Sequence, residues 1–334
     1  MPSTDDHTGH QRLSMERLRA FEALKYGLFI HFGMSTYDGT ELSKGDRPAS
    51  YYAPDKLDVD QWISVARDAG MRYAVLTAKH VAGFCLWPSA HTDYHVGNSS
   101  NKTDVVEAFV NACRKKGVLP GLYYCSWDNH HRLGSVLPDE APSGGSTWWA
   151  NCYVTTRYMH WQYQQLEELH ARYGPVAEWW IDIPHILGFE KRHEQYNHLA
   201  TLTPDAVIAM NHGITNGSKV DITRSWPTDV MSIERNVPDS NRGYNPWQEV
   251  AVTGTDKRTC YVPAEVCDPI GYEWFHVPGD TPRSDQELLA MRLLIESRNA
   301  NFLLNVPPDK SGRIPEDSVA ALMRLRRNYE RWSS

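Results

Sequence analysis

The chain has 334 residues, of which 41% are hydrophobic and 22% are charged, a composition typical of globular proteins. Its formal net charge is −7, and it has no basic tract and no run near the ~18 apolar residues of a membrane span. Nucleic acid and membranes are therefore not expected partners. The six cysteines form no CxxC pair, which argues against zinc and indicates reduced thiols. No secretory signal is visible, so we expect a cytoplasmic protein.

Buried strands and amphipathic helices alternate along most of the chain. Residues 1–14 are polar, and we expect them to form a disordered lead. Apolar runs predict eight strands, at 27–33, 73–78, 121–126, 176–181, 206–210, 229–233, 263–267 and 302–306. Helical periodicity and capping residues predict helices at 15–25, 60–69, 104–116, 147–173, 190–202, 284–298 and 315–332.

This alternation is typical of a (β/α)8 barrel in a chain of this length. The second half is less regular, because no helix follows the fifth strand and an irregular stretch joins the sixth and seventh. A doubly wound sheet is the alternative, but residues 33–35 do not form the glycine-rich phosphate turn usual after its first strand. We therefore predict an α/β protein with a single TIM-like barrel domain over residues 15–334.

Polar side chains gather at the carboxyl ends of the predicted strands, where the active sites of barrels lie. Asp182 is the most informative, because a carboxylate at the end of an apolar strand is costly to bury without a function. The other residues at these ends are His31, Lys79, His80, Ser126, Trp127, Asp128, Asn211, His212, Glu234, Glu265 and Asn305. Carboxylates and imidazoles that converge on one face suit acid–base hydrolysis of a polar substrate.

The chain contains KYGLFIHFG at 25–33, TAKHVAGFCLWPS at 77–89 and NFLLNV at 301–306. These three motifs, in this order, resemble the α-L-fucosidase family of glycoside hydrolases, family 29, and the resemblance extends over about 25–332. It implies a barrel-shaped catalytic domain with irregular helices in its second half. Many members add a C-terminal β-sandwich, for which we expect no room here. It also implies a small carbohydrate or glycoside substrate, no cofactor and no particular oligomeric state.

The resemblance further implies a retaining mechanism with two carboxyl groups. One attacks the anomeric carbon to form a glycosyl-enzyme, and the other protonates the leaving oxygen and then activates water. Asp182 matches the family's nucleophile at the end of the fourth strand. Glu234, shortly before a proline, matches the acid/base, and Glu265 is the competing residue for that role.

Other matches imply residues that contact the sugar or support those that do. The substrate-contacting candidates are His31, Glu41, His80, Trp87, Tyr124, Trp127 and Glu265. The two histidines match imidazoles that bind sugar hydroxyls. Lys79 and Asn305 are expected to be structural supports.

Four positions depart from the family's usual pattern. Val81 stands where a sugar-contacting histidine is common, and Ala82 where an aspartate is common. Leu42 stands in place of a tryptophan, and Ile183 in place of the glycine that often follows the nucleophile. A buried sugar hydroxyl left unpaired would cost on the order of 1–3 kcal/mol.

These departures leave three hypotheses open. The first is a retaining exo-glycosidase for α-L-fucosides or a related deoxy sugar. The second is a diverged enzyme of this fold that acts on a different, less polar substrate, and the third is an inactive carbohydrate-binding barrel. A metal-dependent barrel hydrolase is a poorer match, because His31 is not followed by a His-x-His pattern and the pairs His130–His131 and His91/His95 fall in predicted loops. We therefore predict no metal site.

Overall fold

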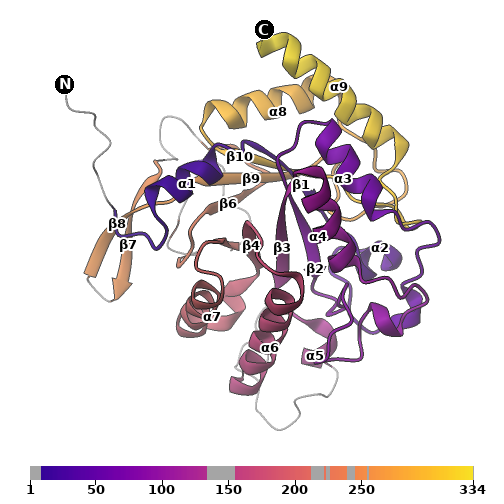
Figure 1. Cartoon of the computed structure of the whole chain (residues 1–334), viewed down its shortest axis with the longest axis horizontal. Helices are drawn as coiled ribbons and strands as arrows, with labels where there is room; N and C mark the ends of the chain where they lie inside the picture. The colour runs from indigo at the N-terminus through magenta and orange to yellow at the C-terminus, as the bar shows by residue number, and fades with distance from the viewer. Residues whose placement is uncertain are drawn as a thin grey trace.

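The computed structural model describes residues 9–133, 155–211, 222, 226–238, 245–253 and 256–333 (Figure 1). Eight parallel strands form one curved sheet in the order β5-β4-β3-β2-β1-β10-β9-β6. They are β1 (Tyr26–Ile30), β2 (Tyr73–Lys79), β3 (Leu119–Cys125), β4 (Glu178–Asp182), β5 (Val207–Asn211), β6 (Met231–Glu234), β9 (Ala264–Pro269) and β10 (Asn301–Asn305). Each overlaps a predicted strand, so the barrel prediction is confirmed.

Helices surround the sheet (Figure 1). The predicted ones are α1 (Met15–Glu22), α3 (Val59–Asp68), α4 (Val105–Lys116), α6 (Thr156–Tyr173), α7 (Gly188–Leu202), α8 (Asp285–Ser297) and α9 (Glu316–Ser333). Shorter segments lie in loops, namely α2 (Met34–Asp38), α5 (Asn129–Leu133), η1 (Ala49–Tyr51), η2 (Val96–Asn98) and η3 (Pro184–Leu187). Positions 147–154 of the helix predicted at 147–173 lie outside the described residues, as does His212. None of the described helices is long and apolar enough to cross a membrane.

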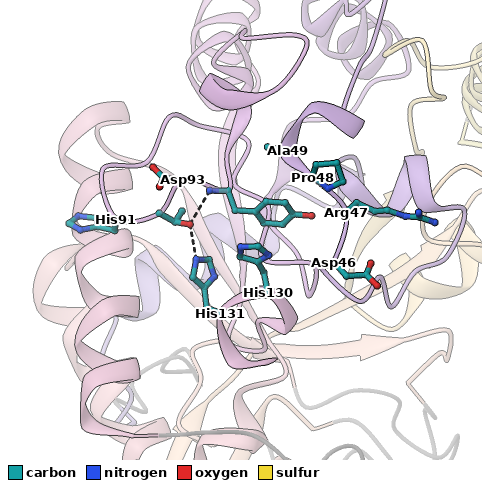
Figure 2. Close-up of a pocket in the computed structure, with 10 residues that line it drawn as sticks. Asp46, Arg47, Pro48, Ala49, His91, Asp93, His130 and His131 are labelled. Atoms are coloured by element: carbon teal, nitrogen blue, oxygen red, sulfur yellow. Dashed lines mark hydrogen bonds between the residues drawn. The ribbon is translucent and has the colours of Figure 1, made fainter. Parts of the chain in front are cut away.

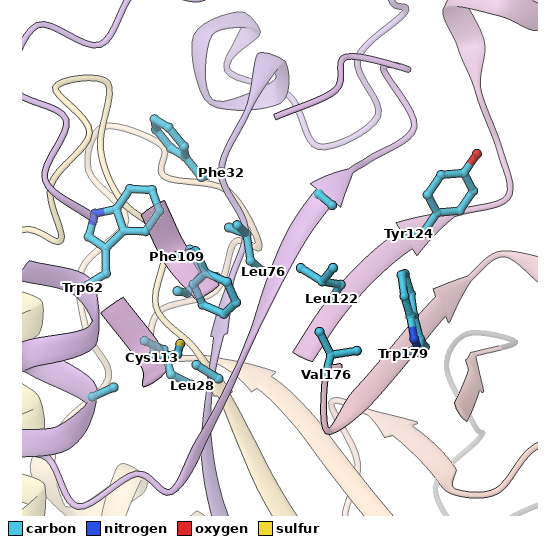
Figure 3. Close-up of a cluster of buried hydrophobic side chains, with 14 of the residues drawn as sticks. Leu28, Phe32, Trp62, Leu76, Phe109, Cys113, Leu122, Tyr124, Val176 and Trp179 are labelled. Atoms are coloured by element: carbon cyan, nitrogen blue, oxygen red, sulfur yellow. The ribbon is translucent and has the colours of Figure 1, made fainter. Parts of the chain in front are cut away.

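Alternating side chains of the strands build two separate cores. Trp180 and Tyr123 point into the barrel, where they stack with their rings 5.5 Å apart. Their neighbours Trp179 and Leu122 point outward and pack under the helices (Figure 3). Because both faces of each strand are covered, the strands read as continuous apolar runs in the sequence. All five described cysteines are buried and free.

A two-stranded hairpin, which the sequence did not predict, lies between β6 and β9. Its strands, β7 (Trp247–Thr253) and β8 (Asp256–Tyr261), pair antiparallel and project beside α1 (Figure 1). Four of the six residues of β8 are exposed, so this strand lacks the buried apolar run that marks the barrel strands.

The barrel closes between β5 and β6 largely through side chains. Within the described residues, Ala209 and Val230 form an isolated parallel bridge at this junction. The backbone N–H of Met210 donates to Thr228 Oγ1 at 3.0 Å, and the N–H of Ile208 donates to the Asp229 carboxylate at 3.0 Å. These side chains satisfy donors that a regular ladder would have paired with carbonyls.

Residues 9–14 pack against this junction, which corrects the prediction of a disordered lead for that part of it; residues 1–8 lie outside the described chain. Arg12 forms an ion pair with the buried Asp229 and donates to the carbonyls of Pro204 and Ala206, each at 2.6 Å. Leu13 is buried. The segment therefore joins the start of β5 to the start of β6.

Candidate active site

Asp182 is the last residue of β4, and its carboxylate accepts three hydrogen bonds. Tyr123 Oη donates to Oδ2 at 2.6 Å, while the Ile183 N–H and Asn211 Nδ2 donate to Oδ1 at 2.9 and 2.8 Å. Burial raises the pKa of Asp182, and these hydrogen bonds oppose that rise because they stabilise the charged form. Three donors thus hold the Asp182 side chain in place and stabilise its ionised form.

Glu234 ends β6 and shares its hydrogen-bond donor with Asp182. Asn211 Nδ2 donates to Glu234 Oε1 at 2.5 Å, and Ser232 Oγ donates to Asn211 Oδ1 at 3.0 Å, which fixes the orientation of the amide. Asn211 Nδ2 bonds to Asp182 Oδ1 at 2.8 Å and to Glu234 Oε1 at 2.5 Å. The distance between these two oxygens therefore cannot exceed the sum of the two bond lengths. That limit accommodates the about 5–5.5 Å separation of carboxyl groups in retaining glycosidases.

Burial raises the pKa of both carboxyl groups, but three hydrogen bonds oppose that rise at Asp182 and one opposes it at Glu234. Burial, and after it the charge of Asp182, raises the pKa of Glu234 to about 8. Asn211 opposes this rise only in part. Two titratable groups whose surroundings push their pKa values apart are suited to opposite roles. Glu234 holds a proton at neutral pH, as a general acid must.

Glu41, in the loop after α2, is a third carboxyl group whose charge acts on this pair. Burial and the charge of Asp182 raise the pKa of Glu41 to about 7, and Arg235 opposes the rise. The Arg235 guanidinium lies 5.0 Å from the centre of the Trp274 ring. Its charge also acts against the raised pKa of Glu234.

His31, directly after β1, is neutral and has a defined tautomer. Asn305 Nδ2 donates to the Trp274 carbonyl at 2.8 Å, so Asn305 Oδ1 accepts the hydrogen bond of 2.8 Å from His31 Nδ1. Burial lowers the pKa of His31 to about 3. The remaining ring nitrogen of His31, Nε2, is therefore an acceptor.

His80, directly after β2, lies beside His31 with the ring centres 5.7 Å apart. Its ring stacks on Tyr123 at 5.5 Å, and Phe275 packs edge-on against it at 4.9 Å. Burial holds the pKa of His80 well below its usual range. Within the described chain, His80 Nδ1 has no hydrogen-bond partner. Two neutral imidazoles thus lie within one cluster with the Asp182 carboxylate.

Two predicted substrate-contacting residues, Tyr124 and Trp87, lie elsewhere and their assignments are corrected, whereas the contact predicted for Trp127 stays a prediction. Tyr124 points outward from the barrel, and its hydroxyl donates to Gln165 on α6 at 2.8 Å (Figure 3). Trp87 is fully buried and donates to Glu168, also on α6, at 2.8 Å. Trp127 is buried in the interior core, with its indole N–H on Asn129 at 2.5 Å.

Glu265, the competing acid/base, lies deeper in the barrel. It pairs in register with Asn301, the first residue of β10, and so sits near the amino end of the sheet. Tyr73 Oη and Trp180 Nε1 donate to its carboxyl group at 2.6 and 3.0 Å. Glu265 is fully buried beneath the site, which corrects both roles predicted for it.

The structure adds residues that the sequence reasoning missed as site components, namely Tyr123, Asn211, Arg235, Trp274 and Phe275. Tyr123 could have been found by alternation along β3, because it lies two residues before Cys125, which pairs in register with Asp182. The sequence indicated Asn211 only as one of several polar residues at the ends of predicted strands. The two aromatic residues come from a loop, where the sequence carries no register signal.

The four departures from the family pattern occupy distinct places. Ile183 has φ of 50°, a left-handed conformation that favours glycine and is strained for a β-branched residue. Val81 is buried in the interior core, and Ile183 packs against that core. Ala82 is also buried, whereas Leu42 is 37% exposed. At two of the four positions, Val81 and Ala82, a buried apolar side chain thus stands where the resemblance implies a polar one.

Comparison with known proteins agrees with this arrangement. The alpha-L-fucosidase family model matches residues 41–327. The alpha-L-fucosidase 1 of Arabidopsis thaliana is 32% identical over 308 residues, which cover 88% of this chain and 56% of that protein. The chain thus spans about half the length of the curated relatives it matches.

Solved structures of similar proteins share the fold. The alpha-L-fucosidase isoenzyme 1 of Paenibacillus thiaminolyticus superposes with a TM-score of 0.72 at 25% identity, covering 94% of this chain and 75% of that one. A glycoside hydrolase 29 family member from an unknown rumen bacterium gives a TM-score of 0.74 at 26% identity, with 93% and 56% covered. On the extent of the family match, this chain belongs to the α-L-fucosidase family, glycoside hydrolase family 29.

Proposed function

We propose that the protein is a retaining, exo-acting α-L-fucosidase, with Asp182 as nucleophile and Glu234 as acid/base. The observation that carries this proposal is the shared Asn211 amide. It holds a carboxylate with three donors next to a carboxyl group whose pKa is raised to about 8. A close pair with opposite protonation preferences is what double displacement at an anomeric carbon requires.

The chemistry follows from these two groups. Asp182 attacks the anomeric carbon while Glu234 transfers its proton to the departing glycosidic oxygen, which leaves a glycosyl-aspartate and an ionised Glu234. Glu234 then takes a proton from water as the water attacks the same carbon, so that the sugar is released and both groups return to their starting states. His31 Nε2 and His80 Nδ1 are free to bind sugar hydroxyls and orient the ring.

A second candidate is a related enzyme of this mechanism for a less polar glycoside or another deoxy sugar. The burial of Val81 and the packing of Ile183 against the interior core favour it, because neither side chain can pair a sugar hydroxyl. The two candidates share the carboxyl pair and differ in the sugar they accept.

The test uses aryl α- and β-glycosides with several sugars, including the α-L-fucoside. We expect hydrolysis of the α-L-fucoside, with the α-anomer as the first product by NMR. Asp182→Ala should lower kcat/KM by about 10³-fold or more, with azide restoring turnover as the inverted glycosyl azide. Absence of turnover of any aryl glycoside by the wild type would refute the proposal, and turnover of another sugar alone would favour the second candidate.

The acid/base assignment has its own test. Glu234→Ala should slow hydrolysis of a fucoside with a poor leaving group far more than that of the 2,4-dinitrophenyl fucoside, which needs little protonation. Glu265→Gln is the matched control and should show no such dependence on the leaving group. The reverse result would move the role to Glu265.

A further inference from the structure

The junction between β5 and β6 differs from the other strand junctions of the barrel, because no hydrogen-bonded ladder closes it in the described residues. On its other side, β5 pairs with β4 in register along the whole of β4. Toward β6, the two backbones meet at the Ala209–Val230 bridge and at the Asp229 N–H, which donates to the Ile208 carbonyl at 2.8 Å. A strand with so few backbone bonds to its neighbour shifts more easily than one held in a ladder.

This weakly paired junction carries part of the proposed catalytic site. Asn211 ends β5 and Glu234 ends β6. The Asn211 amide crosses the junction, since Nδ2 donates to Glu234 Oε1 at 2.5 Å and Oδ1 accepts from Ser232 Oγ at 3.0 Å. Asp182 belongs to the other side, because its strand pairs with β5. The position of β6 relative to β5 therefore sets the separation of the two carboxyl groups.

Residues 9–14, here called the N-terminal strap, cross the same junction at its opposite, amino end. On one side, the His10 N–H donates to the Thr259 carbonyl of β8 at 3.0 Å. The chain leads from β8 into β9, which is the ladder partner of β6. On the other side, Arg12 donates to two carbonyls that directly precede β5. The strap thus spans the gap in the ladder from the β9 side to the β5 side.

Arg12 also holds the start of β6 through Asp229. The two residues form an ion pair, in which the Asp229 side chain is 2% exposed. The same carboxylate accepts from the Ile208 N–H at 3.0 Å and from Tyr196 Oη at 2.6 Å. Removal of Arg12 would leave a buried charge without its cation at this position, and a looser junction that admits water would then be favoured.

The part of the barrel that carries His31 and His80 is held differently. Strands β1, β2 and β3 pair in ladders, and side chains cross-link the loops that follow them. In the cavity between these loops, Thr92 Oγ1 and His131 Nε2 are joined by a hydrogen bond of 2.7 Å (Figure 2). His131 Nδ1 also lies 2.9 Å from Asp128 Oδ2. A change at the β5–β6 junction should therefore leave the two imidazoles in place.

We propose that the N-terminal strap is a positioning element of the active site, in which Arg12 acts through the β5–β6 junction to keep Glu234 at its working distance from Asp182. The inference rests on the proposed function, because it concerns the two carboxyl groups of that reaction. Arg12 lies at the opposite end of the strands and touches neither group, so its role is positioning rather than catalytic.

A looser junction has a defined effect on Glu234. Burial and then the charge of Asp182 raise the pKa of Glu234 to about 8, with a smaller contribution from Glu41, whereas Asn211 and Arg235 oppose the rise. Movement of β6 away from β5 weakens the two largest influences, so the pKa of Glu234 should fall. Misplacement of a reacting group by about 1 Å can also cost about 10²-fold in rate.

The experiment compares Arg12→Ala with Arg17→Ala on an aryl α-L-fucoside. Arg17 is the matched control, because it donates to the carbonyls of Ala177 and Asp205 before β4 and β5, whose junction is closed by a ladder. Arg12→Ala should lower kcat by about 10-fold or more, leave KM nearly unchanged and move the fall of kcat/KM at high pH to lower pH. Arg17→Ala should change none of the three.

Arg12→Lys keeps a positive charge beside Asp229 and should restore most of the lost kcat. All assays are run at a temperature at which circular dichroism shows the variants to be folded. A variant that merely loses folded enzyme lowers kcat and leaves the pH profile in place. An unshifted profile in Arg12→Ala, or equal effects of Arg12→Ala and Arg17→Ala, would therefore overturn the proposal.

Hydrogen–deuterium exchange tests the junction without relying on activity. The amides of β6 should exchange faster in Arg12→Ala than in the wild type, while those of β4 keep their protection. Unchanged exchange in β6, or equal acceleration in β4 and β6, would contradict the role of the strap at the junction. Faster exchange in β6 with an unchanged kcat would contradict its role in catalysis. A wild type that hydrolyses no aryl glycoside refutes the proposed function, and the exchange in β6 still decides whether the strap holds the junction.

Discussion

Asn211 illustrates how much one side chain decides at this site. Its amide oxygen is occupied by Ser232 Oγ, so both N–H groups are directed toward carboxyl oxygens, one on Asp182 and one on Glu234. An aspartate here would bring a third negative charge between the two groups. The neutral amide instead holds them close without adding to their repulsion.

The charge of Glu41 should raise the upper pH limit of activity, in addition to burial and the charge of Asp182. A negative Glu41 favours the protonated form of Glu234, so removing that charge lowers the pKa of Glu234 from about 8. Glu234 must be protonated to act as an acid, and the fall of kcat/KM at high pH should therefore begin at lower pH in Glu41→Gln. The pH–rate profile on an aryl fucoside measures this, with Asp205→Asn as an unshifted control. If kcat/KM of Glu41→Gln begins to fall at the same pH as in the wild type, or at a higher pH, Glu41 does not have this role.

At the scale of elements, the barrel strands could be predicted because both of their faces are buried. Hairpin β7–β8 could not, since most of β8 is exposed and has no buried apolar run. Burial alone was also insufficient to predict which residues belong to the site. Tyr123 and Tyr124 are both aromatic and both buried, and only the register of β3 against β4 shows which one reaches Asp182.

Residues near the ends of strands were predictable as a group, but their depth in the barrel was not. Glu234 and Glu265 both follow apolar residues of predicted strands. In the structure, the first ends its strand, and the second stands near the start of β9. A shift of two positions along a strand moves a side chain by about 6.6 Å, from the mouth of the barrel into its interior.

The segment at residues 9–14 should contribute to stability through Arg12. Arg12→Ala leaves the buried Asp229 carboxylate without its cation at the junction of β5 and β6, where Asp229 also accepts the Ile208 N–H. We expect a loss of about 3–5 kcal/mol in the free energy of unfolding, measured by urea denaturation. Arg67→Ala removes an exposed ion pair with Asp68 and should change it by less than about 1 kcal/mol. Equal effects of the two changes would show that Arg12 does not support the junction.

At the scale of the whole molecule, the buried acids of the barrel make stability depend on pH. Burial raises the pKa of Glu265 to about 7, and burial and the charge of Glu265 raise the pKa of Glu178 well above its usual range. The folded state therefore binds protons more tightly than the unfolded one at these groups. The contribution of Glu265 is full below about pH 4.5 and is lost as pH rises through about 7, and that of Glu178 is lost at higher pH because its pKa is raised further. Buried His31 and His80, whose pKa values are lowered, act in the opposite direction.

Glu178→Gln isolates the contribution of the acids, because the histidines are the same in both proteins. The variant should gain stability relative to the wild type as pH rises from 5 to 8, since it no longer has to place a second charge beside Glu265. Urea denaturation at several pH values measures the difference. Glu330→Gln, at a mostly exposed position on α9, should show no such trend. A constant difference across this range would contradict the assignment of the two acids as a coupled pair.

The pairing of the first strand with the last has a consequence for how the protein is made on the ribosome. Tyr26 of β1 lies in register with Phe302 of β10, and His31 is oriented by Asn305. As the chain emerges, β1 therefore remains an open edge of the sheet until β10 has been translated, and the entropy cost of closing this long loop arises only then. His31, the first residue of the site to be synthesised, gains its orienting partner only after the nucleophile and the acid have emerged. The orientation of His31 therefore depends on the pairing of β10 with β1.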